Sequence, residues 1–202
     1  MRDRYGEVFP LGGLAGLPFT GKTGWGAFSH HVPENGNIVV LYAPHVGISS
    51  DGKVGAVHRP GQEEPTSACG ASIGAYKALT PEDAEAGRHL KDAESRDRQM
   101  EYIIAALRPH VEKVRGAGEH NAVMAALAFE TYAMVEQMLF EVIDRHWMSE
   151  ESKLVLLGGI MLNVDGDAPD QFVPLRFESH DKNGNVNDLM QMSFGESSAQ
   201  FA

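Results

Sequence analysis

The sequence predicts an α/β protein with a mostly parallel central sheet flanked by helices. Residues 38–46 and 153–164 are both apolar runs, and near-continuous apolar strands are typical of a parallel sheet that is buried on both faces. Between them, residues 121–146 repeat apolar side chains at spacings of three and four, as expected of a long helix with a buried face. Strands that alternate with helices favour the α/β class.

The elements around the first strand are short. Trp25 and Phe28 are three residues apart and share one face of a predicted helix over residues 20–31. Residues 1–19 carry many glycines and prolines and are interpreted as an irregular arm. The other elements expected here are a turn at 33–36, the first strand at 38–46 and a short second strand at 53–57.

Helices fill the middle of the chain, and strands return near its end. A helix is expected over residues 69–79. The next helix begins at Thr80, with Pro81 at its first position and Asp83 in its first turn, and Pro109 should end or kink it. The remaining predictions are the helix at 121–146, the strand at 153–164, a strand at 171–178 that Pro174 assigns to an edge, a tight turn at 182–185 and a mobile tail at 195–202.

Composition limits the classes of partner. The chain of 202 residues shows no repeat, linker or low-complexity tract, so residues 1–202 are interpreted as one domain. The formal net charge of −11 argues against a general nucleic-acid binder or a protein of anionic membrane surfaces, because both need a basic face. We expect no membrane span, since no apolar segment has the required length.

The single cysteine bounds the compartment. One cysteine cannot form an intrachain disulfide, which favours a reducing environment. The start of the chain lacks the apolar region of a signal peptide. The sequence therefore predicts a cytoplasmic protein, or a protein of an organelle after removal of a targeting segment.

His45 and Cys69 are candidate ligands of one zinc ion. His45 follows the apolar part of the first strand, and ligands of open α/β sheets collect outside the carboxyl ends of strands. Cys69 opens a predicted helix, whose N-terminus favours the thiolate that a metal needs. Zinc accepts imidazole and thiolate together. The plainer alternatives are a histidine that bonds a carbonyl at the strand end and a buried thiol that only packs.

Further polar residues are candidates for the same site. His30 and His31 could supply a third ligand, with at most one reaching it because neighbouring helix residues point about 100° apart; a favourable interaction with the helix C-terminus is the alternative. Asp51 and Arg59 flank a glycine-rich turn. An Asp51 held by Arg59 would stay ionised and accept a hydrogen bond from a metal-bound water, whereas a plain surface ion pair would contribute little.

A phosphate-binding loop is the competing hypothesis. Residues 16–23, GLPFTGKT, match the Walker A pattern, which requires a buried strand before the loop and a helix after it. The preceding residues make a poor strand, and Pro18 and Phe19 lie inside the loop. Residues 161–165 would then supply the Walker B strand and its acid, Asp165. The simpler interpretation is a glycine turn that caps a helix, with Lys22 in solvent.

Several segments of the chain resemble a known family. They are LPFTGKTGWGAFSHHVPENGNIVVLYAPHVGISSDGKVG, HRPGQ, SACGA, GGIMLN and DQFVPLRFE, and they are similar to the low-CO2-inducible B/C proteins, the theta-type carbonic anhydrases, over residues 9–178. The resemblance implies a fold like that of beta-type carbonic anhydrases, a zinc site, a homodimer or higher homo-oligomer, and reversible hydration of CO2 to bicarbonate. It also implies an alternative, a catalytically silent zinc-binding subunit of a CO2-concentrating assembly.

The resemblance also implies roles for residues. Cys69 matches the helix-opening Cys-Gly of the beta-type site, and His45 lies where that site places its strand-end ligand. Asp51 and Arg59 match the Asp–Arg dyad. The beta-type set is two cysteines and one histidine, whereas this chain has one cysteine. The third ligand is then a histidine, with His31 or His30 favoured, an aspartate or water. The apolar wall that holds CO2 would consist of Phe19, Trp25, Val46 and Ile48.

Overall fold

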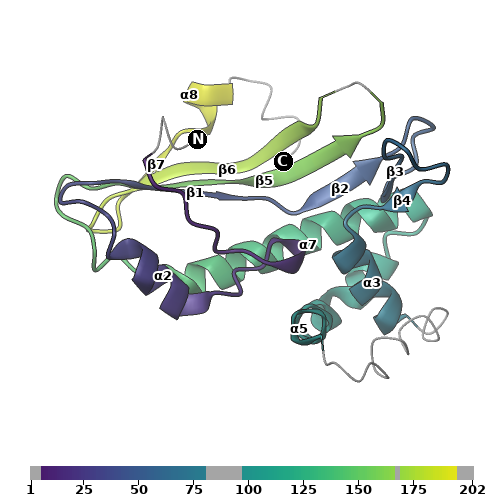
Figure 1. Ribbon diagram of the computed structural model, residues 1–202, viewed down its shortest axis with the longest axis horizontal. Coiled ribbons are helices and arrows are strands. Elements are labelled where there is room, and N and C mark those ends of the chain that lie inside the picture. Colours follow the sequence, from purple (N-terminus) through teal and green to yellow (C-terminus); the bar gives the residue numbers. More distant parts are fainter. Residues whose placement is uncertain (1–5, 81–96, 167–168, 195–202) are drawn as a thin grey trace.

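The computed structural model describes residues 6–80, 97–166 and 169–194, and it has an α/β fold (Figure 1). β5 lies inside the central sheet, with β1 and β2 along one side of it and β6 and β7 on the other. The strands of this sheet are β1 (Ile38–Tyr42), β2 (His45–Ile48), β5 (Leu154–Val164), β6 (Gln171–His180) and β7 (Val186–Asp188). A small separate sheet pairs β3 (Ala56–Val57) with β4 (Thr66–Ser67).

The predicted first strand is interrupted rather than continuous. β1 ends at Tyr42, β2 begins at His45, and both pair in parallel with β5. Pro44 between them has no N–H to donate, but its carbonyl accepts the Met161 N–H at 2.9 Å. The ladder therefore continues through the gap and holds His45 on the sheet.

The α/β class is confirmed, but the sheet is only partly parallel. β6 is antiparallel to β5, and β7 is antiparallel to β6. Only residues 165–170 connect β5 to β6, too few for the crossover that a parallel pair requires. Pro174 lies opposite Gly159 at a register shift and outside the β6 residues that pair with β7. The predicted edge position of Pro174 therefore holds locally.

Helices cover one face of the sheet (Figure 1). The long α7 (His120–Val142) runs beneath the strands, whereas α8 (Met190–Phe194) lies on the opposite face. α5 (Arg98–Leu107) ends just before Pro109, as the sequence predicts. The other helical elements are η1 (Leu14–Gly16), α2 (Gly21–Ser29), α3 (Gly70–Leu79), η3 (Arg108–His110) and α6 (Val111–Arg115).

The prediction that the first strand is buried on both faces is wrong. Val40 is 7% exposed on the helix-covered face of β1, whereas Val39 and Leu41 are 52% and 55% exposed. Successive strand residues point to opposite faces, so the last two lie on the face that α7 leaves open. An apolar run marks a strand but does not tell whether one or both of its faces are covered.

The expectation that no segment could span a membrane needs a correction. α7 is long and apolar enough by length and composition, with a mean hydropathy of 1.2, but 56% of that window is buried inside the protein. A core helix passes the same test, and α7 packs against the sheet through Leu127, Val135 and Leu139.

The predictions at Pro81 and Asp83, and the mobile tail at 195–202, lie outside the described residues.

One polar cluster ties α7 to the covered face of the sheet. The Glu136 carboxylate accepts hydrogen bonds from Tyr42 Oη at 2.8 Å, Tyr132 Oη at 2.6 Å and Arg176 Nε at 2.7 Å. Burial raises the pKa of Glu136, but Arg176 and the two hydroxyls outweigh it and lower the pKa overall. A half-buried carboxylate is stabilised by such partners, so these bonds fix how α7 sits on β1 and β6.

Leu156→Ala should lower the free energy of unfolding by about 2–5 kcal/mol, because Leu156 on β5 is fully buried and its truncation leaves a cavity. Val186→Ala is the control, at a residue of the edge strand β7 that is 56% exposed, and should cost about 0.5 kcal/mol or less. Urea denaturation followed by circular dichroism measures both variants. Equal losses in the two variants would contradict the burial of Leu156.

Candidate functional site

His45 begins β2 and points its ring towards β5. Gly47, two residues further along β2, is in register with Asn163, so His45 and Asn163 lie on the same face of neighbouring strands. His45 Nδ1 lies 2.6 Å from Asn163 Oδ1. The strand pairing therefore sets the position of the imidazole, and the amide of Asn163 sets its rotation.

Cys69 reaches His45 because the β3–β4 pair packs closely against β2. The Gly47 N–H donates to the Ala68 carbonyl at 2.9 Å, and the Gly55 N–H donates to the Gly47 carbonyl at 2.8 Å. A Cβ on Gly47 would lie 2.6 Å from the Ala56 carbonyl oxygen, so only glycine permits this approach. The Ala68–Cys69 peptide bond is cis, and Cys69 then forms the N-cap of α3.

The imidazole and the thiol are electrostatically coupled. Burial raises the pKa of Cys69, but the hydrogen bond with His45 and the Ser72 groups at the start of α3 outweigh it and lower the pKa to about 7. The same bond to Cys69 raises the pKa of His45, against the effect of burial. The pair therefore favours a thiolate beside a histidine at neutral pH, and a thiolate is the form of cysteine that binds metals.

A small cavity adjoins the pair. Its volume is about 10 Å³, close to that of a single water or ion. Its wall comes mainly from α3 and α7, and its lining residues are His45, Val46, Gly55, Ala68, Cys69, Ser72, Ile73, Met124, Leu127, Ala128 and Thr131. Cys69 lies only 7% exposed in this wall, so the thiol is shielded from bulk solvent.

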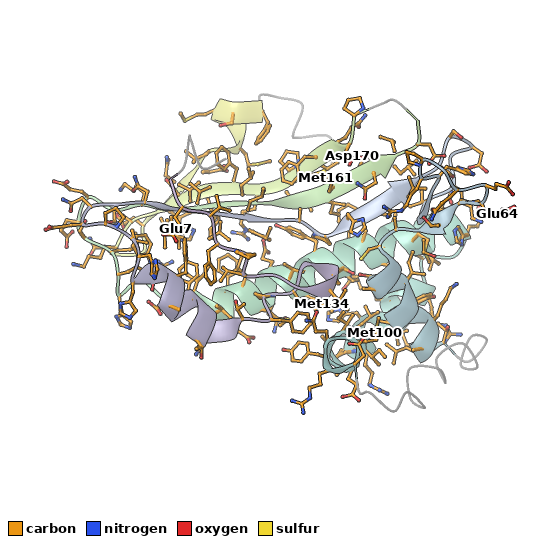
Figure 2. The ribbon with its side chains drawn as sticks, viewed as in Figure 1. Glu7, Glu64, Met100, Met134, Met161 and Asp170 are labelled. Carbon is orange, nitrogen blue, oxygen red and sulfur yellow. The ribbon has the colours of Figure 1, made fainter. Side chains whose placement is uncertain are left out.

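His45 also borders an open groove of about 920 Å³. Figure 2 labels Met161 and Asp170, which lie in this groove above β5 and β6. Leu41, Val57 and Met161 give it apolar walls, while Arg59 and His58 give it polar ones. A small substrate in the groove would therefore contact the imidazole from the solvent side.

The structure does not bring His30 or His31 to this site. Both follow α2, before the start of β1, whereas His45 comes seven residues after Ile38. The whole of β1 and the step at Pro44 therefore lie between these histidines and His45. His31 instead lies 3.4 Å from Glu7. Among the residues that the structure describes, no third His, Cys, Asp or Glu gathers around a possible metal position.

Asp51 and Arg59, both described, do not pair. Asp51 accepts hydrogen bonds from Ser49 Oγ at 2.5 Å and the Lys53 N–H at 3.3 Å, and the Ser49 bond chiefly lowers its pKa. Arg59 Nε donates to Thr66 Oγ1 at 3.2 Å. Asp51 is therefore bound within its own turn at residues 49–53, and Arg59 is bound to Thr66 of β4.

Asp165 is the acid that organises the loops near the groove. It accepts hydrogen bonds from the Ser50 N–H at 2.8 Å and the His58 N–H at 2.5 Å, and it contacts His58 Nδ1 at 2.7 Å. Burial raises its pKa, but the bonds with His58 and Ser50 lower it to about 2 overall. Asp165 therefore joins the end of β5 to the loops around β2 and β3.

The predicted apolar wall is only partly assembled. Val46 lines the small cavity. Phe19 packs edge-to-face on Tyr102, with ring centroids 5.6 Å apart, and Trp25 packs on Phe28 at 6.3 Å. Neither aromatic residue, nor Ile48, lines the cavity or the groove. Trp25 belongs to the hydrophobic core instead, and Phe19 packs against it.

The Walker-like segment lacks the context of a P-loop. In the described part of the chain before it, residues 6–15, there is no strand, and a 3-10 helix, η1, precedes the loop. α2 follows at Gly21, and the first strand comes only after that helix. Asp165 is engaged by Ser50 and His58. The structure therefore gives the nucleotide-binding hypothesis no support.

Sequence reasoning missed three residues of the site. Asn163 and Asp170 form a hydrogen-bonded pair behind His45, and Ser72 supports the thiolate of Cys69. The spacing of Ser72, three residues after a helix N-cap, was an available signal. Asn163 is a polar residue within the apolar run of β5, and this was another available signal. Its partner depends on strand pairing, which the sequence does not show.

The fold and the site define an α/β protein that pairs a strand-end imidazole with a helix-opening thiol beside its central sheet. The family model described as limiting CO2-inducible proteins B/C beta carbonic anhydrases matches residues 1–181. The chain therefore belongs to the limiting CO2-inducible protein B/C family. No match is found among curated proteins.

Solved structures agree with this assignment. The chain is 31% identical to PtLCIB4, a homolog of the limiting CO2-inducible protein LCIB, with a TM-score of 0.77 over 91% of this chain and 74% of that chain. LCIB itself is 16% identical, with a TM-score of 0.51 over 89% of this chain and 70% of that chain, and this likeness shows the fold alone.

The Cys69 thiolate should form as the pH rises through about 7, rather than through the ordinary thiol pKa of 9.0. His45→Ala removes a hydrogen bond that lowers this pKa and leaves the burial that raises it, so the midpoint should move upward. Thiolate ultraviolet absorbance of the metal-free chain measures the titration, with the exposed His146 changed to Ala as control. An unchanged midpoint in His45→Ala would contradict the pairing.

Proposed function

We propose that this chain is a zinc-dependent carbonic anhydrase that interconverts CO2 and bicarbonate. The observation that carries the proposal is the His45–Cys69 pair, which adjoins a cavity of about 10 Å³ on one side and an open groove on the other. Membership of the limiting CO2-inducible protein B/C family supports it.

The residues present fit a zinc ion. Imidazole nitrogen and thiolate sulfur are the donors that zinc prefers, and the lowered pKa of Cys69 supplies the sulfur in its binding form at neutral pH. Catalytic zinc sites commonly have three protein donors and one position for water. His45 and Cys69 supply two donors, so water would also take the third position. Zinc, when bound, lowers the pKa of water to about 7 and so supplies a nucleophile for CO2.

The residues around the groove suit the substrates. Leu41, Val57 and Met161 offer apolar contact to CO2, which carries no charge, while the Arg59 guanidinium offers a counter-charge to bicarbonate. His58 lies in the same groove, has a 44% exposed side chain and is held by Asp165. A histidine that contacts solvent can carry protons away from the site to buffer.

A catalytically silent zinc-binding subunit of a CO2-concentrating assembly is the second candidate. The shielded thiol favours it, because Cys69 is 7% exposed and the pair uses only two protein donors. Such a subunit would bind zinc without turnover. Bound metal and turnover must therefore be measured separately.

Cys69→Ser and His45→Ala should each lose bound zinc and lower the rate of CO2 hydration by at least about 100-fold, because each removes one of two protein donors. Elemental analysis measures the zinc, and stopped-flow hydration with a pH indicator measures the rate. His146→Ala, a change at an exposed histidine, should keep both.

Zinc and activity that survive both site changes would overturn the proposal. A wild-type chain that holds one zinc per protomer and shows no hydration above background would instead establish the silent subunit. Wild-type protein without zinc affinity would exclude both candidates.

The remaining expectations stay predictions. A homodimer or higher homo-oligomer should appear in light scattering after size-exclusion chromatography, and Val39 on the open sheet face is 52% exposed, an apolar surface that such an assembly would cover. Val39→Asp should then shift the mass towards the monomer, whereas a monomeric wild type would contradict the assembly. The cytoplasmic or organellar location also stays a prediction.

A further inference from the structure

We infer that Asn163 and Asp170 are positioning residues that fix which nitrogen of His45 carries the proton. The link to zinc rests on the proposed function, but the hydrogen bonds that carry the inference belong to the chain itself. The three side chains form a series: His45 Nδ1 lies 2.6 Å from Asn163 Oδ1, and Asn163 Nδ2 donates to Asp170 Oδ2 at 2.8 Å.

The orientation of the amide follows from Asp170. A carboxylate accepts hydrogen bonds and cannot donate them. The two oxygens of Asp170 accept from Asn163 Nδ2 and, at 3.3 Å, from the Val164 N–H. An Asn163 amide rotated by 180° would place its oxygen against the carboxylate and lose that bond. The NH2 group of Asn163 therefore faces Asp170, and its carbonyl oxygen faces His45.

The tautomer of His45 follows from Asn163. An amide oxygen is an acceptor only. The 2.6 Å hydrogen bond between His45 Nδ1 and Asn163 Oδ1 therefore requires that Nδ1 carry the hydrogen. Nε2 is then the nitrogen left to face Cys69. In the neutral ring with its hydrogen on Nδ1, Nε2 holds the free lone pair.

This arrangement prepares Nε2 as a metal ligand. A ligating histidine commonly donates its other N–H to a carbonyl or carboxylate, which fixes the ring and raises its basicity. Here the supporting group sits on β5, whose parallel pairing with β2 sets the geometry. Asp170 lies just before β6 and accepts the Asn163 hydrogen bond from there. It lines the same groove as His45 (Figure 2).

The first test uses the metal-free chain with 15N-labelled histidine. We expect a slowly exchanging Nδ1–H resonance, assigned to His45 by its loss in His45→Ala. It should disappear in Asn163→Leu and return in the double variant Asn163→Asp, Asp170→Asn. That double change exchanges the two groups, so a carboxylate at 163 still accepts from the ring while an amide at 170 donates to it.

The second test is zinc affinity, measured by competition with a chelator. Asn163→Leu should bind zinc about 10- to 100-fold more weakly, and the double variant should recover most of the loss. Asn187→Leu, at an exposed asparagine of β7, is the matched control and should bind as the wild type does. Circular dichroism checks that every variant is folded.

The outcomes separate the two proposals. If the Nδ1–H resonance is absent from the wild type, or Asn163→Leu keeps wild-type zinc affinity, the positioning role is overturned while the zinc site stands. If the wild type shows the resonance but binds no zinc, the proposed function fails and the tautomer assignment stands, with its link to metal overturned.

Discussion

The hydrogen bonds that hold the His45 imidazole from two sides are the constraint on which the site depends. Asn163 fixes one ring nitrogen at 2.6 Å, and Cys69 engages the ring from the α3 side. Neither contact is local in sequence. Both require β2 to be in its observed register with β5, because a slip of one residue would turn His45 to the other face. The chemistry of the chain thus depends on strand pairing.

The close approach of β3 and β4 to β2 is the second requirement. Gly47 has no side chain between the strands, and its N–H and carbonyl bind Ala68 and Gly55. α7 closes the other side of the cavity, with Met124, Leu127 and Thr131 in its wall. The thiol therefore loses solvent but gains hydrogen bonds, and the balance lowers its pKa despite burial. Packing and electrostatics act on the same residue in opposite directions.

The aspartates near His45 accept hydrogen bonds from different parts of the chain. Asp165 and Asp170 both accept backbone and side-chain hydrogen bonds that join β5 to its surroundings. Asp51 is taken up by its own turn, and Arg59 by Thr66. With a net charge of −11 on the chain, Arg59 supplies a positive charge at the groove, where an anionic substrate would contact it.

The sequence by itself determined the α/β class, the positions of β5, α3 and α7, and the two residues that meet at the site, because apolar periodicity, helix caps and the chemistry of His45 and Cys69 are local properties. It placed Asp51 with Arg59 and His31 near the predicted zinc position, and in both cases the structure shows other partners. Only the tertiary structure decided that one sheet face stays open, that β6 runs antiparallel, and that Asn163 and Asp170 support His45. These outcomes depend on contacts between residues far apart in the chain, whose geometry no local pattern encodes.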